Sequence, residues 1–139
     1  MKKRVLFLCT GNSCRSQMAE GWLRHLARDR AEVFSAGTHP AGLNPLAVQV
    51  MDEIEIDISA QQSDLLDRYF DSVFDYVITV CDSARQACPV FPGEGQMIHW
   101  SFADPADAQG TAAERLPVFR RVRDEIGQRL LGFAAAERI

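Results

Sequence analysis

The chain alternates between two patterns of apolar and polar residues. Runs of consecutive apolar residues, typical of strands buried in a parallel sheet, cover residues 4–9, 33–37, 76–80 and 97–100. Apolar residues spaced three and four apart, typical of amphipathic helices, occur over 16–28, from Asn44-Pro45, from Ser63-Asp64 and over 111–133. Strands that alternate with helices predict an α/β fold, a mostly four-stranded parallel sheet with helices on both faces.

Length and charge narrow the class of protein. A chain of 139 residues fits one domain, so we expect residues 1–139 to form a single one, and from its size a monomer. The net charge of −4 gives no basic excess for binding nucleic acid. No apolar run approaches the ~18 residues of a membrane span, so we expect a cytoplasmic protein. Four cysteines in a reducing compartment predict catalytic, redox or metal-binding thiols.

The first strand runs into a loop that carries the candidate chemistry. The segment reads Cys9-Thr10-Gly11-Asn12-Ser13-Cys14-Arg15-Ser16, and a helical pattern begins at its end. The dipole of that helix and the Arg15 guanidinium both favour a thiolate at Cys9. Inward-pointing backbone N–H groups of the loop can bind a tetrahedral oxyanion, which Arg15 can hold with two hydrogen bonds.

The remaining loop residues have simpler expected roles. We expect a positive φ angle at Gly11 and Asn12. Ser16 can either donate a hydrogen bond to the Cys9 thiolate or cap the helix. By alternation, Cys14 points away from Cys9 and is interpreted as structural. The alternative for the whole segment is a structural loop with a buried, inert Cys9.

Cys81 ends the third strand and lies seven residues before Cys88. If residues 82–88 are helical, the two cysteines lie about 10 Å apart along the axis. A disulfide needs Cα atoms within roughly 7 Å, so pairing would require this segment to unwind. The Pro- and Gly-rich stretch 89–95 permits that change, which suggests a switch between a Cys81 that faces Cys9 and a Cys81 paired with Cys88. Two buried thiols and a zinc site are the alternatives, although the spacings are not those of zinc fingers.

A carboxylate follows the fourth strand. Because ligands of parallel sheets bind at the carboxyl ends of the strands, Cys9, Cys81 and Asp104 are expected at one edge. Asp104 can serve there as a general acid or simply form a turn with Pro105. The three histidines show no shared spacing and receive no functional role; they are His25, His39 and His99.

These motifs together resemble the thioredoxin-coupled arsenate reductases, which share the fold of the low molecular weight protein tyrosine phosphatases. The resemblance rests on the stretch from Cys9 to Trp22, on Cys81 and Cys88-Pro89, and on His99-Trp100 with Asp104-Pro105. It covers essentially the whole chain. It implies an enzyme of arsenic detoxification that reduces arsenate to arsenite.

The resemblance also implies an order of events. Cys9 attacks arsenate held by the loop residues Thr10 to Ser16, including Arg15, while Asp104 helps water leave. Cys81 then attacks the Cys9 sulfur, arsenite departs, and Cys88 attacks Cys81. Thioredoxin reduces the resulting Cys81–Cys88 disulfide.

No tightly bound cofactor is implied, but some members of the family bind potassium near the loop. The matching positions in this chain are Asn12, Glu20, Ser35 and Asp64.

Two other readings stay open. The phosphatases of this group have Pro where Gln17 stands and an aromatic residue where Ala106 stands, and they do not need Cys81 and Cys88. A non-catalytic thiol sensor would use the same cysteines without an oxyanion loop, and its thiol switching should survive mutation of Arg15. Within the reductase reading, glutaredoxin or mycothiol could replace thioredoxin as the reductant.

Overall fold

The computed structural model describes residues 2–82, 84, 91–93 and 95–139. Four parallel strands form one sheet in the order β2-β1-β3-β4. Their bounds are β1 Lys3–Cys9, β2 Ala31–Gly37, β3 Tyr76–Thr79 and β4 Gln96–His99. The central strand β1 pairs with β2 over its whole length and with β3 from Val5 to Leu8. The parallel sheet predicted from the apolar runs is confirmed.

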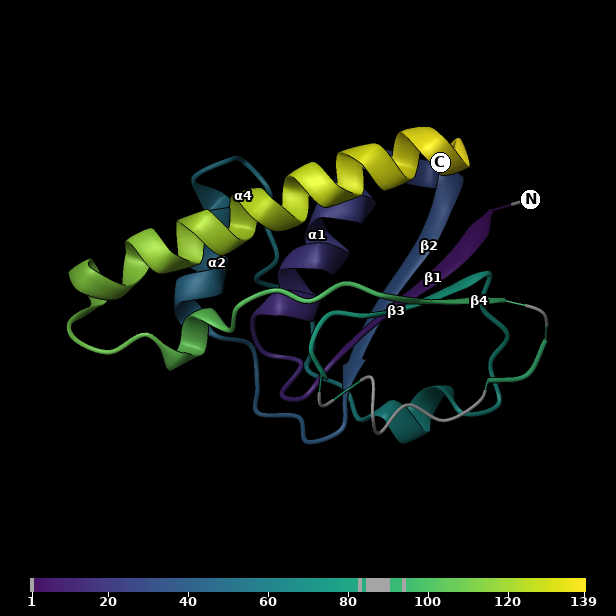
Figure 1. Cartoon of the computed structure of the whole chain (residues 1–139), viewed down its shortest axis with the longest axis horizontal. Coiled ribbons are helices and arrows are strands. Elements are labelled where there is room, and N and C mark those ends of the chain that lie inside the picture. The colour runs from purple at the N-terminus through teal and green to yellow at the C-terminus, as the bar shows by residue number, and fades with distance from the viewer. Residues whose placement is uncertain (1, 83, 85–90, 94) are drawn as a thin grey trace.

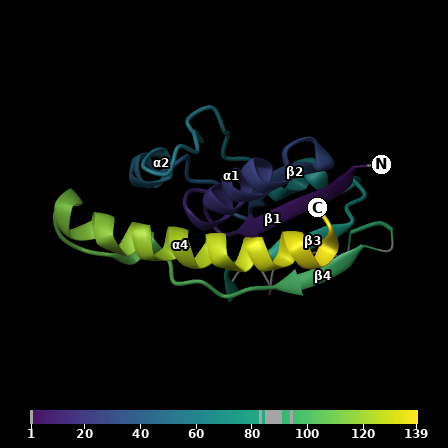
Figure 2. The ribbon, with the colours of Figure 1, turned by 90° about the horizontal axis from the view of Figure 1, so that it is seen from above.

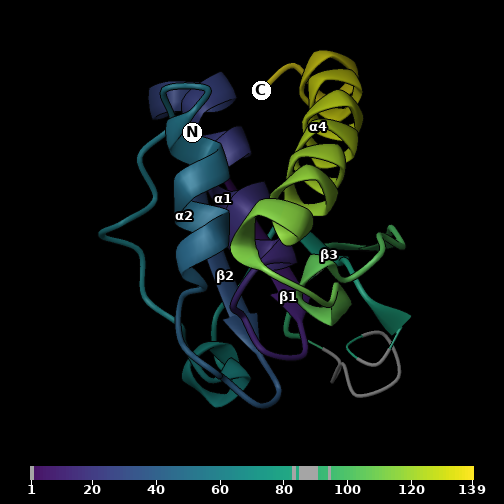
Figure 3. The same ribbon diagram turned by 90° about the vertical axis from the view of Figure 1, so that its left-hand side faces the viewer.

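Helices lie on both sides of this sheet. The α-helices are α1 Arg15–Ala27, α2 Pro45–Asp52 and α4 Ala112–Glu137. They lie together above the sheet in Figure 1, and the view from above in Figure 2 shows α4 running beside α1. The 3-10 helix η2 (Leu66–Tyr69) lies on the opposite side, as the side view in Figure 3 also shows. Two shorter 3-10 helices are η1 Arg28–Arg30 and η3 Pro105–Asp107.

Local sequence signals fix where α2 and α4 begin. The Asn44 side chain accepts a hydrogen bond from the backbone N–H of Leu46, the predicted cap of a helix that starts with proline. Thr111 and Glu114 exchange side-chain and backbone hydrogen bonds in a capping box at the start of α4. Pro117 is the sixth residue of α4, beyond the first turn in which N–H groups have no helical partner, so it removes one hydrogen bond from the helix.

One predicted helix is wrong. The segment opened by Ser63 and Asp64 forms only the four-residue η2. Gly37 donates its backbone N–H to the carbonyl of Asp64, and Gly37 and Leu65 form a β-bridge, so the chain is extended there. Helical geometry can therefore begin only at Leu66. The apolar residues expected on the buried face of that helix are also not all buried, because Phe70 is 43% exposed.

The core lies on both faces of the sheet, under the α-helices on one side and against η2 on the other, where Leu66 and Tyr69 are buried. Val5, Leu6 and Phe7 of β1 are fully buried, as are Phe119 and Ile126 of α4. Burial of β1 on both sides fixes Cys9 at its end in a rigid position. Among the described residues, no helix is both long and apolar enough to cross a lipid bilayer. The predicted short helix over 82–88 lies outside the described residues, apart from Asp82 and Ala84.

Candidate active site

The loop after β1 has its backbone carbonyls turned outward. The carbonyls of Thr10, Gly11, Asn12 and Ser13 each accept a hydrogen bond from a surrounding group. The donors are, in turn, His39 N–H at 2.9 Å, Ala41 N–H at 2.8 Å, Gln17 Nε2 at 2.9 Å and Asn44 N–H at 3.1 Å. In a trans peptide the N–H points opposite to the C=O, so the four following N–H groups face into the loop. This orientation makes the predicted oxyanion nest.

Two donors reach the Cys9 sulfur within this loop. The Asn12 backbone N–H lies 3.1 Å from Cys9 Sγ, and the Ser16 hydroxyl lies 2.8 Å from it. Asn12 has the predicted positive φ, at 45°, whereas Gly11 does not. The sulfur also faces the N-terminus of α1, whose dipole favours negative charge. Two hydrogen-bond donors and the first turn of a helix therefore surround the Cys9 sulfur.

The direction of the Ser16 hydrogen bond follows from its neighbours. Asn12 Oδ1 accepts from the Asp64 backbone N–H, which fixes the orientation of the Asn12 amide. Asn12 Nδ2 then donates to Ser16 Oγ at 2.8 Å and to Ser35 Oγ at 2.9 Å. Because the Ser16 oxygen accepts from Asn12, its own proton is free for Cys9. Of the two roles predicted for Ser16, the structure places it as a donor to the thiolate; no side-chain cap bond is made at the start of α1.

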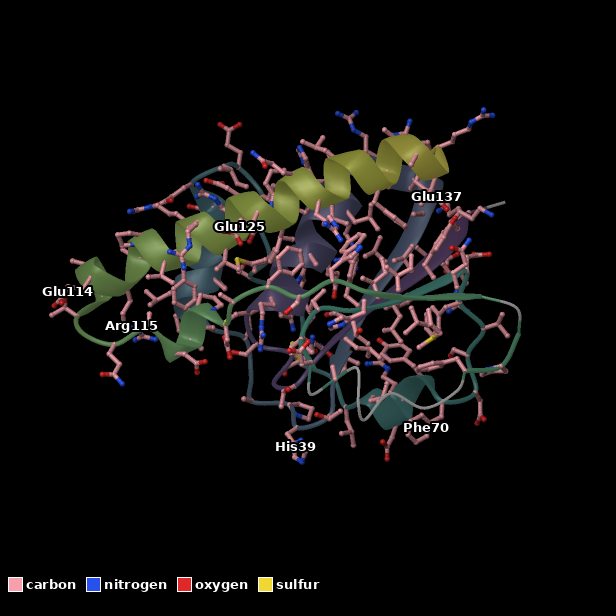
Figure 4. The ribbon with its side chains drawn as sticks, viewed as in Figure 1. His39, Phe70, Glu114, Arg115, Glu125 and Glu137 are labelled. Carbon is pink, nitrogen blue, oxygen red and sulfur yellow. The ribbon has the colours of Figure 1, made fainter. Side chains whose placement is uncertain are left out.

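Arg15 and Asp104 meet across the mouth of the loop. Their Nη2 and Oδ2 atoms lie 3.2 Å apart, and Arg15 Nη1 donates to the Phe102 carbonyl. Asp104 Oδ1 accepts from the Ala106 backbone N–H. Arg15 and Asp104 line one cavity of about 330 Å³ together with Cys9 and with four residues of the loop, namely Thr10, Gly11, Ser13 and Cys14. His39, at the lower edge of the molecule in Figure 4, lines the same cavity.

Cys81 follows β3 at the same edge of the sheet. The Val80 N–H still bonds to the Leu8 carbonyl, which keeps the chain paired with β1 beside Cys9. Cys81 Sγ lies 3.4 Å from Thr10 Oγ1, and the side chain is 3% exposed. The predicted meeting of Cys9, Cys81 and Asp104 at one edge is therefore confirmed. Cys88 lies outside the described residues.

Cys14 is a buried thiol at the start of α1. Burial raises the pKa of Cys14 to about 12, so the thiol stays protonated at physiological pH. The protonated state agrees with the structural role predicted for Cys14, but the residue lines the same cavity as Cys9, which the alternation did not predict. Its backbone N–H still belongs to the oxyanion nest.

Sequence reasoning missed two residues that hold the loop. Gly37 ends β2, and a Cβ atom there would lie 2.5 Å from the Thr10 carbonyl oxygen and 2.9 Å from the Asn12 nitrogen. Gln17 is fully buried and joins the Asn12 carbonyl to the Gln62 carbonyl through its Nε2 atom. A Gly that ends a strand beside a Gly-Asn loop signals such a close approach, whereas Gln17 offers no pattern that singles it out.

The four positions matched to potassium binding do come together. Ser35 donates to Glu20, Asn12 donates to Ser35, and Asp64 bonds to Asn12 through its backbone. Arg24 already places a positive charge 2.7 Å from Glu20 Oε2. The oxygens are thus engaged by hydrogen bonds and by a guanidinium. The Arg24 guanidinium would compete with a cation for Glu20, and potassium binding at these four residues stays a prediction.

Glu20 is the buried acid of this group. Burial raises its pKa above the ordinary range, while hydrogen bonds from Ser35 and Arg24 oppose that shift. Glu20, Ser35 and Asp64 line a second cavity of about 370 Å³ together with Arg24. This cavity lies behind the loop and is separate from the one that Cys9 lines.

Known proteins similar to this chain share the same architecture. The family model for low molecular weight phosphotyrosine protein phosphatase matches residues 4–138. An arsenate reductase of Halalkalibacterium halodurans is 53% identical over 133 residues, which cover 96% of each chain. A solved structure described as an arsenate reductase in oxidized state aligns with a TM-score of 0.83 at 32% identity, over 96% of this chain and 98% of that one.

A further solved structure is that of a thioredoxin-dependent arsenate reductase from Corynebacterium glutamicum. It aligns with a TM-score of 0.72 at 28% identity, over 97% of this chain and 60% of that one. The matches with the reductases and with the family model each span nearly the whole chain. The chain therefore belongs to the low molecular weight phosphotyrosine protein phosphatase family, in the branch that contains the arsenate reductases.

Proposed function

We propose that this protein reduces arsenate to arsenite through a relay of three cysteines that thioredoxin regenerates. The observation that carries the proposal is the position of Cys81, whose sulfur lies 3.4 Å from Thr10 in the oxyanion loop of Cys9. A phosphatase clears its phosphoryl-cysteine with water and needs no second thiol there. The names of the similar proteins support arsenate as the substrate.

The first step forms a bond between Cys9 and arsenic. The oxyanion binds in the nest, and Arg15 turns from Asp104 to hold two of its oxygens. The Cys9 thiolate attacks As(V), and one oxygen leaves as water. Asp104 supplies a proton to that oxygen, for which it must first be protonated and released from Arg15.

The second step reduces the arsenic. The Cys81 thiolate attacks Cys9 Sγ and forms a disulfide. The electron pair of the Cys9–arsenic bond stays with arsenic, which leaves as As(III) arsenite. Two thiolate sulfurs are oxidised and one arsenic atom is reduced, so the electrons balance. The position of Cys81 beside Thr10 supports this attack.

The third step returns the enzyme to its starting state. Cys88 attacks Cys81, which frees the Cys9 thiolate and leaves a Cys81–Cys88 disulfide. Thioredoxin then reduces this bond. The support for thioredoxin as the reductant is the thioredoxin-dependent arsenate reductase among the similar structures.

The test is arsenate-dependent NADPH oxidation with thioredoxin and thioredoxin reductase. We expect sustained turnover by the wild type and about one equivalent of arsenite from Cys88→Ala, because that variant stops at the Cys9–Cys81 disulfide. An Arg15→Lys variant is expected to lose turnover because lysine cannot hold two oxygens in a planar fork. A wild type that gives no turnover with any thiol reductant contradicts the proposal.

The same assay distinguishes an arsenate reductase from a phosphatase. The oxyanion nest and Cys9 suit phosphate esters as well, so slow hydrolysis of p-nitrophenyl phosphate is compatible with a reductase. Hydrolysis without any arsenate turnover would instead make the protein a phosphatase. Loss of all thiol chemistry in Arg15→Lys would exclude the sensor, whose switching does not require the guanidinium.

A further inference from the structure

His99 joins two residues that stand on either side of Cys81 in the chain. Its Nδ1 atom lies 2.7 Å from the hydroxyl of Thr79, the last residue of β3. Its Nε2 atom lies 2.9 Å from a carboxylate oxygen of Asp82, the residue after Cys81. One imidazole at the end of β4 therefore links the side chains of a residue before the cysteine and a residue after it.

The hydrogen-bond partners of His99 determine which of its ring nitrogens carries a hydrogen. The Asp82 carboxylate can only accept, so His99 Nε2 carries a hydrogen and donates it. In neutral histidine Nδ1 then accepts from the Thr79 hydroxyl. In charged histidine Nδ1 donates to the Thr79 oxygen, and the hydroxyl can turn to the Ile98 carbonyl at 3.5 Å. The bridge is satisfied in both protonation states.

The two ends of the bridge differ in rigidity. Thr79 is 3% exposed, and its carbonyl accepts a hydrogen bond from the Trp100 backbone N–H at 2.8 Å. The Asp82 side chain is 75% exposed. The His99 ring, whose side chain is 20% exposed, thus links a fixed sheet edge to a residue held more loosely beyond Cys81.

Two polar groups among the described residues contact the Cys81 sulfur. The Thr10 hydroxyl and the Ala84 backbone nitrogen both lie 3.4 Å from Sγ. The backbone on both sides of Cys81 also limits where the sulfur can lie. Before Cys81 the backbone is held by the bond between Val80 and Leu8, and after it by the bridge from His99 to Asp82.

We propose that His99 is a positioning residue for Cys81, which holds this cysteine beside the oxyanion loop through Thr79 and Asp82. The proposal rests on the proposed function, in which Cys81 attacks Cys9. Fixing the backbone on both sides of Cys81 limits the positions of its sulfur and raises the fraction aligned for attack.

The test measures the step in which Cys81 acts. In a Cys88→Ser background, reduced protein is mixed with arsenate, and the Cys9–Cys81 disulfide is quantified by acid quench and mass spectrometry. His99→Asn keeps a nitrogen near the Nδ1 position for Thr79 but cannot reach Asp82. His99→Gln places its amide nearer the Nε2 position and retains the reach to Asp82.

We expect His99→Asn and Asp82→Ala to slow disulfide formation about tenfold each, as expected when a well-aligned group loses its alignment. The double variant should be no slower than either one, because both remove the same contact. His99→Gln should recover part of the rate. His25→Asn, an exposed histidine on α1, serves as the matched control and should keep the rate of the Cys88→Ser protein.

Phosphate binding at the Cys9 loop, measured by protection of Cys9 from alkylation, separates positioning from general damage. It should be unchanged in every variant. Wild-type disulfide rates in His99→Asn and Asp82→Ala would overturn the proposal, and so would a parallel loss of phosphate binding. Failure of the Cys88→Ser protein itself to form the disulfide would overturn the relay, and with it this role of His99.

Discussion

Gly37 ends β2 directly beside the oxyanion loop, and its replacement by alanine tests whether the shape of that loop controls the chemistry. The new methyl group would lie 2.5 Å from the Thr10 carbonyl oxygen and 2.9 Å from the Asn12 nitrogen. Both atoms belong to the backbone, so neither can move aside without shifting the loop. The Asn12 nitrogen is also the group that donates to Cys9 Sγ.

The size of the effect follows from these contacts. Overpacking of this kind costs about 1–3 kcal/mol. At roughly 4 °C per kcal/mol for a domain of this length, the melting temperature of Gly37→Ala should fall by about 4–12 °C. Activity should fall further than stability, because displacement of reacting groups by about 1 Å can cost ~100-fold in rate.

The assay combines thermal unfolding with arsenate turnover at a temperature where the variant is folded. Gly132→Ala is the matched control, because a Cβ at Gly132 on α4 meets no atom within 4 Å. Alanine should leave its activity unchanged and stabilise the helix by up to ~1 kcal/mol. Wild-type stability and turnover in Gly37→Ala would refute the claim that this close approach shapes the loop.

Three further variants test the groups behind the nucleophile. Ser16→Ala removes the hydrogen bond to the nucleophilic sulfur of Cys9, worth about 1.5–3 kcal/mol where negative charge develops, so arsenate turnover should fall roughly 10- to 100-fold. Unchanged turnover would show that Ser16 does not support the nucleophile. Glu20 has a raised pKa in the folded protein, so the native state binds more protons than the unfolded chain, and its contribution to stability falls as pH rises above about 4.3. The free energy of unfolding of the wild type minus that of Glu20→Gln, from urea titrations, should therefore decline with rising pH, and a rise would contradict the assigned direction. Because Arg24 supplies the positive charge beside Glu20, wild-type turnover should be equal in potassium and tetramethylammonium salts, whereas Arg24→Met should respond to potassium; a potassium-dependent wild type would contradict this.

Much of the fold follows from local pattern. Buried strands need consecutive apolar residues, and the apolar runs at 4–9 and 76–80 have the length of a strand and are too short for a typical helix. The caps at Asn44 and Thr111 act within three residues of themselves, so sequence shows them directly. The helix expected from Ser63 failed because the chain there pairs with the end of β2, a contact that its own residues do not encode.

The candidate site likewise contains residues that the sequence predicts and residues that only the structure reveals. Cys9 and Arg15 lie within one continuous motif, and the rule for parallel sheets brings Cys81 and Asp104 to them. Gln17 and His99 act through partners distant in sequence, Gln62 and Asp82 respectively, so their roles emerge only in three dimensions. A glutamine or a histidine alone gives no signal of the partner it will meet.

The most direct test of the central claim is the stoichiometry of a single turnover without any external reductant. Reduced wild-type protein is mixed with excess arsenate, and arsenite, free thiols and disulfide linkages are measured together. The account predicts about one arsenite per protein chain, loss of two of the four thiols, and a Cys81–Cys88 linkage in peptide mapping. Arsenite formed without loss of thiols, or a disulfide that excludes Cys81, would contradict it.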